Sequence, residues 1–221
     1  MENNAIASEY RTLKDLVYEY IASNVSKGTF DTNGKIVEQQ VSDALGVSRT
    51  PVREALIQLA SEGYLESIPR RGFFVSRLTE QMACDVVNIL GPLDGRAAFL
   101  AMPNMTDDDV AKMQFLQGSI GLAIDQGLFR MHDKLQKDFH ECYYAKCPNK
   151  KLIDYIRQLN RYFIRREVDN LSEDDLVANL RKANEEHAEI VRLFKARDAV
   201  GVQDYIRDVH WDVSVARTFV W

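Results

Sequence analysis

The chain has 221 residues, of which 46% are hydrophobic and 28% charged, ordinary proportions for a globular protein large enough to form two small domains. No run approaches the ~20 apolar residues of a membrane-spanning helix, and the first residues lack the basic start and apolar core of a secretory signal. We therefore expect a cytoplasmic protein with no membrane partner. The net charge of −5 gives no global indication of nucleic-acid binding, and three unpatterned cysteines indicate reduced thiols.

Three helices are predicted at the beginning of the chain. The first covers residues 10–25, ends at Gly28 and is followed by a polar loop, Thr29 to Lys35. The second ends at Gly46, and the third begins a few residues later with Pro51 in its first turn, where no helical hydrogen bond is lost. The apolar positions that give the second and third helices their inward faces are Val37, Val41, Ala44, Leu45, Val52, Ala55, Leu56 and Leu59.

After the third helix, the spacing of the apolar residues changes from that of a helix to that of a strand. Tyr64–Ile68 and Phe73–Ser76 are short strand-like runs on either side of residues 69–72, Pro-Arg-Arg-Gly, which is typical of a hairpin. Helices joined by a tight turn and followed by a hairpin form a winged helix-turn-helix. We expect a DNA-binding domain over residues 1–78 and an effector-binding and dimerisation domain over residues 79–221.

Beyond the hairpin the sequence has only helical patterns. They cover residues 80–101, 106–126, 129–146, 149–169, 173–196 and 198–219. Six helices with short connections favour an antiparallel bundle. The predicted fold class is therefore mainly α, with an N-terminal winged helix-turn-helix and a C-terminal antiparallel six-helix bundle.

The start of the third helix has the features of a DNA-reading helix. Arg49 and Arg53 are four residues apart and share a face opposite the apolar one, and arginine can clamp guanine with two hydrogen bonds. Ser48 and Thr50, either of which can cap the helix, have hydroxyls that can hold phosphate oxygens together with free backbone N–H groups. This segment is the first candidate DNA-binding site.

The hairpin tip adds a second basic group. Arg70 and Arg71 would reach the DNA backbone or the minor groove beside the third helix. Residues 48–77 contain five arginines and three glutamates, a local charge of +2. An arginine pair taken alone is more often a solvated surface, but the turn spacing, the cap and the basic hairpin tip together favour DNA binding.

The segments SRTPVREAL and EGYLESIPRRGFFV resemble the GntR family of bacterial regulators, over about Tyr10 to Val75. The resemblance implies DNA-contacting positions at Gln39, Arg49, Arg53 and Gly72. Family members often carry arginine where Gln39 stands, and glutamine could read adenine instead. We expect a homodimeric repressor that inserts its third helices into the half-sites of a palindromic operator.

Three histidines of the second domain fall on inward helix faces. If the last two predicted helices form a hairpin centred near residue 198, then His187 and His210 lie at one level, and His140 can join them. Three converging imidazoles could bind zinc, nickel or manganese; the alternative is that they are hydrogen-bonded core residues. His132, two turns before His140, could assist the other histidines, but a partly exposed position is favoured.

The second domain resembles the FCD ligand-binding domain of the FadR-type branch, and its six-helix length resembles the VanR-like subgroup. The matching segments are Asp138–His140 with Pro148 and Asn149, Glu186–Ile190, and Tyr205–His210. Metal-binding members place an aspartate one turn before the first histidine, where this chain has Gln136, a weaker neutral ligand. They also commonly place an arginine one turn before the acidic residue that matches Asp94, where this chain has Leu90.

A small organic acid is the expected effector, because a metal held by three neutral imidazoles keeps positive charge and open coordination positions. Gln136, Arg161 and Arg165 are further candidate effector contacts. Ligand binding would change the affinity for DNA by favouring one of two pre-existing arrangements.

Two alternative functions are open at this point. One is a metal-dependent hydrolase with a zinc-bound water, but Glu186 and Glu189 are predicted to point away from His187, which leaves no general base. The other is a sequence-nonspecific DNA-binding protein, against which the acidic overall balance argues, since such binding depends on neutralising phosphates.

Overall fold

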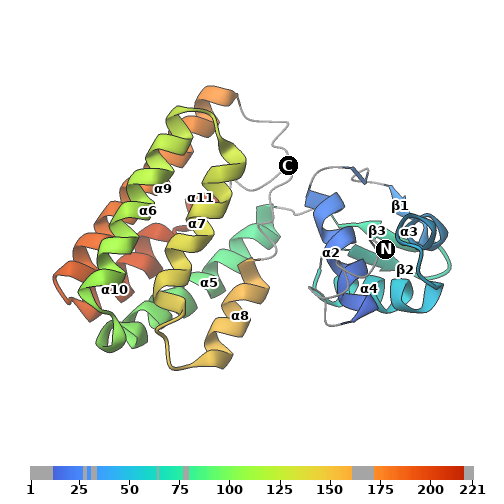
Figure 1. The fold of residues 1–221 in the computed structure, drawn as a ribbon, viewed down its shortest axis with the longest axis horizontal. Coiled ribbons are helices and arrows are strands. Elements are labelled where there is room, and N and C mark those ends of the chain that lie inside the picture. Colours follow the sequence, from blue (N-terminus) through green and yellow to red (C-terminus); the bar gives the residue numbers. More distant parts are fainter. Residues whose placement is uncertain are drawn as a thin grey trace, which may run out of the picture. The chain divides into compact units, whose positions relative to one another are not determined.

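The computed structural model describes residues 12–26, 29–30, 34–63, 65–76, 80–160 and 172–216. The chain divides into two compact units, one drawn chiefly from residues 1–78 and the other chiefly from residue 79 onward (Figure 1). Each unit buries its own set of apolar side chains.

The described residues of the first unit form three helices and a small sheet (Figure 1). Helix α2 spans Leu13–Ser26, α3 spans Glu38–Leu45 and α4 spans Arg49–Ser61. Their shared core includes Val17, Ile21, Val41, Val52, Leu56 and Leu59. Val37 and Ala44 are exposed, which corrects their predicted inward placement. Val37 is the N-cap of α3, and Ser42 rather than Ala44 lies on the buried side of this short helix.

The turn between α3 and α4 is closed by Gly46 in the left-handed conformation, at φ 64° and ψ 31°. Glycine adopts this conformation without the steric cost that a Cβ brings. The backbone N–H groups of Gly46 and Val47 both donate to the Ser42 carbonyl, and the Ser42 hydroxyl donates to the Val47 carbonyl at 2.6 Å. These bonds set the direction in which α4 leaves α3.

The sheet has three antiparallel strands in the order β1-β3-β2. The predicted hairpin is formed by β2, Leu65–Ile68, and β3, Gly72–Val75, with Ile68 opposite Gly72. Strand β1, Lys35–Ile36, pairs with the other edge of β3, so the predicted loop ends one residue earlier than expected. A strand of two residues has no alternation that a sequence pattern could detect.

The second unit is helical throughout its described part. Its helices are α5, Glu80–Ala101; α6, Asp107–Asp125; α7, Phe129–Tyr144; α8, Lys150–Asn160; α9, Glu173–Lys195; α10, Ala199–Tyr205; and α11, Val213–Ala216, with a short 3₁₀ turn, Met102–Asn104, after α5. None of the described helices has both the length and the apolar character needed to cross a bilayer. Cys84, Cys142 and Cys147 are free thiols, as predicted.

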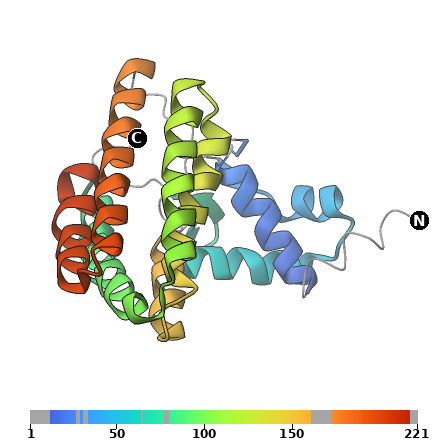
Figure 2. The same ribbon diagram turned by 60° about the vertical axis from the view of Figure 1, so that its left-hand side comes forward.

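Helix α6 packs against both α7 and α9 (Figures 1 and 2). At one end of α6, Asp125 pairs with Arg181 near the start of α9; at the other, Asp107 pairs with Arg197 beyond the end of α9. Helices α6 and α9 are therefore antiparallel. Because α6 and α7 are also antiparallel neighbours, α7 and α9 run in the same direction.

The last predicted helix, residues 198–219, is broken, which corrects the expectation of one continuous helix. A π-helical turn, Ile206–His210, follows α10, and the Trp211 N–H donates to the Ile206 carbonyl at 3.1 Å. Trp211 also donates from its ring nitrogen to Asp94 of α5 at 2.7 Å. Helices α5 and α10 cross so closely that a Cβ at Gly95 would lie 2.5 Å from the Gln203 carbonyl oxygen.

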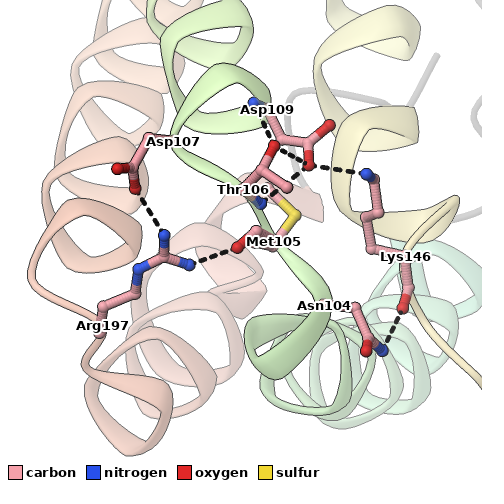
Figure 3. Close-up of polar contacts among 7 residues, drawn as sticks. All are labelled: Asn104, Met105, Thr106, Asp107, Asp109, Lys146 and Arg197. Atoms are coloured by element: carbon pink, nitrogen blue, oxygen red, sulfur yellow. Dashed lines mark hydrogen bonds and ion pairs between the residues drawn. The ribbon is translucent and has the colours of Figure 1, made fainter.

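A polar corner ties the start of α6 to the ends of α7 and α9 (Figure 3). Thr106 and Asp109 form a reciprocal capping box at the start of α6, and Lys146 pairs with Asp109 at 2.7 Å. Arg197 donates to the Met105 carbonyl and to Asp107. The corner therefore joins the start of α6 to the ends of α7 and α9, the two helices that carry His140 and His187.

Candidate DNA-binding helix and trihistidine centre

The first turn of α4 is exposed and leaves its capping hydroxyl free. Ser48 is the N-cap, at φ −70° and ψ 165°, but its side chain makes no capping hydrogen bond. Ser48, Arg49 and Thr50 are all exposed. The unpaired N–H groups of this helix start and two hydroxyls are therefore available to a phosphate.

Gln39 and Arg49, both predicted to contact DNA, are bonded to each other. The Arg49 Nε donates to the Gln39 side-chain oxygen at 2.8 Å, and the Gln39 amide donates to Asp43 at 2.6 Å. Both residues are exposed. The pair presents one polar surface across α3 and α4, and the bonds to Gln39 occupy part of the Arg49 guanidinium.

Arg53 is held by a partner that the sequence did not indicate. Its guanidinium donates two hydrogen bonds of 3.0 Å to the carboxylate of Glu38, and the Arg53 side chain remains 65% exposed. The bond to Glu38 raises the pKa of Arg53 above its usual value. Glu38 belongs to the first turn of α3. Arg53 therefore faces solvent, but its charge is paired with that of Glu38.

The hairpin tip holds an arginine in an unfavourable backbone conformation. Arg70 has φ 63°, in the left-handed region that side chains with a Cβ rarely adopt. Arg71 is exposed and its guanidinium carbon lies 5.3 Å from the centre of the Phe74 ring, while Gly72 has φ 103°. The turn thus presents two adjacent arginines on its surface.

In the second unit, His140, His187 and His210 lie together inside the bundle. One ring nitrogen from each can be chosen so that all three lie within 4.8 Å of one another. The Nε2 atoms of His140 and His210 are 3.3 Å apart. A tetrahedral zinc ion with bonds of ~2.1 Å holds its ligands about 3.4 Å apart, so this pair already has the spacing of a metal site.

The other nitrogens of two of these rings are anchored. The His140 Nδ1 lies 2.9 Å from the backbone carbonyl of Gln136, and the His210 Nδ1 lies 3.0 Å from the Glu186 carboxylate. A carbonyl and a carboxylate only accept, so both Nδ1 atoms carry a proton, and the Nε2 atom of a ring with no further proton carries a lone pair. Lone pairs facing each other at this distance repel, unless a proton or a cation lies between them.

Glu186 corrects a sequence prediction. It was expected to point away from the histidines, but it is 7% exposed and contacts His210. The π-helical turn covers this side of α9 and widens its buried face beyond the positions that a helical period assigns. The carboxylate orients a histidine and is not a spare base, while Glu189 pairs with Arg192 and remains on the surface side.

His187 is fully buried and both of its ring nitrogens lack a hydrogen-bond partner within the described residues. Its ring centre lies 4.4 Å from that of Phe139. Burial, followed by the neighbouring histidines, lowers its pKa well below the usual value, so the ring is neutral. A neutral, unpartnered imidazole beside two oriented lone pairs fits a divalent metal ion.

The remaining predicted positions are distributed differently. His132 is 4% exposed, which corrects the expectation of partial exposure. Gln136 is half-buried and contributes its backbone carbonyl to His140; a role for its side chain stays a prediction. Arg161 and Arg165 lie outside the described residues. Asp94, beside the buried Leu90 of the same helix, is fully buried.

Asp94 is held by two neutral donors from other elements. It accepts from the Tyr143 hydroxyl at 2.8 Å and from Trp211 at 2.7 Å. Burial, followed by the nearby carboxylate, raises the pKa of Tyr143 well above its usual value, so the hydroxyl keeps its proton. These bonds attach α7 and the segment after the π-helical turn to α5.

The first unit has the fold of a winged helix-turn-helix, and the second is a helical bundle that buries three histidines side by side. Comparison with known proteins assigns this combination to a family. The model for bacterial regulatory proteins of the gntR family matches residues 13–75, and the FCD domain model matches residues 85–209. The chain therefore belongs to the GntR family of bacterial regulators, in the FadR-type branch that carries an FCD domain.

Relatives share this organisation. The HTH-type transcriptional regulator McbR of Escherichia coli K12 is 26% identical over 84% of this chain and 83% of McbR. The HTH-type transcriptional repressor GlaR of the same organism is 21% identical over 86% of this chain and 89% of GlaR. YdhC of Bacillus subtilis strain 168 is 26% identical over 65% of this chain, and the match spans 64% of YdhC.

Solved structures agree on the fold. E. coli McbR/YncC matches 95% of this chain and 99% of its own with a TM-score of 0.75 at 21% identity. A GntR regulator from Rhodococcus sp. RHA1 matches 92% of this chain and 96% of its own with a TM-score of 0.70 at 15% identity. Because the relatives are transcriptional regulators, the chain is a DNA-binding regulator and not an enzyme.

Proposed function

We propose that this chain is a cytoplasmic, homodimeric repressor that binds a palindromic operator. A small carboxylic acid changes its affinity for the operator, so that the protein either releases the DNA or binds it more tightly. Residues 1–78 form the DNA-binding domain, and residues 79–221 form the effector-binding and dimerisation domain. GlaR, which aligns over most of this chain, is named a repressor, which supports the same role here.

Recognition of DNA rests on the exposed start of α4. Arg49 and Arg53 read base edges from the major groove, and the Ser48 and Thr50 hydroxyls hold phosphates. Gln39 shares in recognition through its bond to Arg49. The wing residues Arg70, Arg71 and Gly72 contact the DNA backbone or minor groove beside the helix.

Effector sensing rests on the trihistidine centre. His140, His187 and His210 hold zinc, nickel or manganese, which supplies a positive charge and open positions for a carboxylate. The observation that carries this proposal is the 3.3 Å distance between the Nε2 atoms of His140 and His210, two rings whose Nδ1 atoms are held by hydrogen bonds. The Gln136 side chain, and Arg161 and Arg165, are further effector contacts, and the VanR-like subgroup stays part of this proposal.

Three measurements test the proposal on the full-length protein. Selection from a random duplex pool should enrich an inverted repeat; equal retention of all sequences would show a nonspecific DNA-binding protein instead. Calorimetric titration of chelator-treated protein with Zn²⁺, Ni²⁺ and Mn²⁺ should show one ion per chain, with loss in His140→Ala. Binding of an inverted-repeat duplex should then respond to simple carboxylic acids only in the metal-loaded protein.

A further inference from the structure

Several buried polar atoms of the second unit lack partners within the described residues. Among them are the His132 Nε2, the Asn184 Oδ1 and the ring nitrogen of His187 that a single metal ion cannot use. His132, Asn184 and His187 are 4%, 9% and 0% exposed. An unpaired buried polar atom destabilises the fold, so each one indicates a ligand or an ordered water.

His132 and Asn184 are displaced from the trihistidine centre in the same direction along the bundle. His132 is two turns before His140 on α7, ~12 Å along the helix, and Asn184 is one turn before His187 on α9. Because α7 and α9 run in the same direction, both residues are displaced towards the starts of these helices. His132 is among the groups that, after burial, lower the pKa of His187, which agrees with its lying near that ring.

The hydrogen-bonding capacity of these atoms specifies the group that they would hold. The His132 Nδ1 lies 3.1 Å from the Asp133 carboxylate, which only accepts, so the Nδ1 carries a proton and the Nε2 of a singly protonated ring accepts. The Asn184 Oδ1 can only accept. Gln117 donates to the Asn184 backbone carbonyl, not to its side chain, and a Cβ at Gly121 would lie 3.2 Å from the Asn184 Nδ2, so α6 closely covers this side chain.

We infer that His132 and Asn184 form a second subsite, which holds a hydroxyl or amine group at the far end of the acid whose carboxylate binds at the trihistidine centre. This inference rests on the proposed function and names the effector class: a hydroxy or amino acid whose donor group is separated from the carboxylate by a short chain. A second carboxylate would meet two acceptors and is disfavoured.

Calorimetry on full-length, zinc-loaded protein tests the subsite with matched probes. Pentanoate, 5-hydroxypentanoate, 5-aminopentanoate and glutarate have similar lengths and differ in the terminal group. The hydroxy or the amino acid should bind about tenfold more tightly than pentanoate, and glutarate should gain nothing. His132→Phe and Asn184→Leu should each reduce the preference severalfold and leave pentanoate affinity unchanged, whereas Asn179→Leu on the same helix should change neither.

Unfolding of the metal-free variants provides a second readout. Removing an unpaired polar atom should leave the melting temperature of His132→Phe or Asn184→Leu unchanged or raise it, and either variant suffices if the other does not fold. Equal affinities for pentanoate and the donor-bearing acids, or preferences that survive both substitutions, would overturn the subsite and leave the metal centre standing. If no acid binds zinc-loaded protein, the effector part of the proposed function fails and the subsite fails with it.

Discussion

The Nε2 atoms of His140 and His210 lie 3.3 Å apart inside the bundle, although 70 positions separate the two residues in the chain. A partner at the Nδ1 atom orients each ring: the Gln136 carbonyl orients His140, and the Glu186 carboxylate orients His210. Partners of this kind fix the tautomer and the orientation of a metal-binding imidazole. The centre is therefore organised by residues that need not touch the ion.

Glu186→Gln should weaken zinc binding by about 10- to 100-fold, because the amide keeps the shape of the side chain but loses the charge that orients His210. Competition with a fluorescent chelator measures the affinity. Glu189→Gln, three residues away and paired with Arg192 on the surface, is the control and should bind zinc as the wild type does. Equal affinities in the two variants would show that Glu186 plays no part in the centre.

Arg53→Ala and Glu38→Gln should change DNA binding in opposite directions. Loss of Arg53 should cost about 1–3 kcal/mol of binding free energy. Loss of the Glu38 charge should tighten DNA binding up to about fivefold, because Arg53 then has no ion pair with Glu38 to break before it contacts the DNA. Fluorescence anisotropy at fixed salt measures both, with Arg130→Ala in the second unit as control. Weaker binding by Glu38→Gln would mean that the ion pair positions Arg53 for recognition.

Arg70→Gly should weaken DNA binding without destabilising the first unit. The substitution removes a Cβ from a residue in the left-handed conformation, which relieves strain, but glycine also gives the unfolded chain more conformational freedom. The free energy of unfolding should therefore rise by roughly 0–1 kcal/mol. The control is Arg71→Gly, which has no positive φ to relieve and should lower stability by about 0.5–1 kcal/mol. Urea unfolding measures both variants; a similar loss in each would show that Arg70 carries no backbone strain.

Acid should weaken the corner at the start of α6 through Asp109. Hydrogen bonds from Lys146, followed by those from Thr106, lower the pKa of Asp109 from 3.8 to about 2. A lowered folded-state pKa stabilises the fold above the unfolded value, and this stabilisation is lost as the pH falls from about 4 towards about 2. Thermal unfolding of Asp109→Asn should therefore depend less on pH over this interval than that of the wild type. Asp108→Asn, in the same turn and exposed, should follow the wild type, and parallel curves for all three proteins would contradict the assignment.

The sequence by itself determined the order of helices and hairpin, the left-handed turn at Gly46 and the outward face of Arg49 and Arg53. Helical period and glycine chemistry are local, so they place a side chain relative to its own helix. They also put His187 and His210 on inward faces of α9 and the segment after it, because both lie among apolar neighbours.

Only the tertiary structure decided what covers each helix. Glu186 is buried because the π-helical turn packs over its side of α9, and His132 is buried although the sequence predicted partial exposure. The pairing of Arg53 with Glu38 and the two-residue strand β1 likewise depend on partners that are distant along the chain. A periodic pattern contains no information about a neighbouring element, because burial and pairing arise only when separate elements pack together.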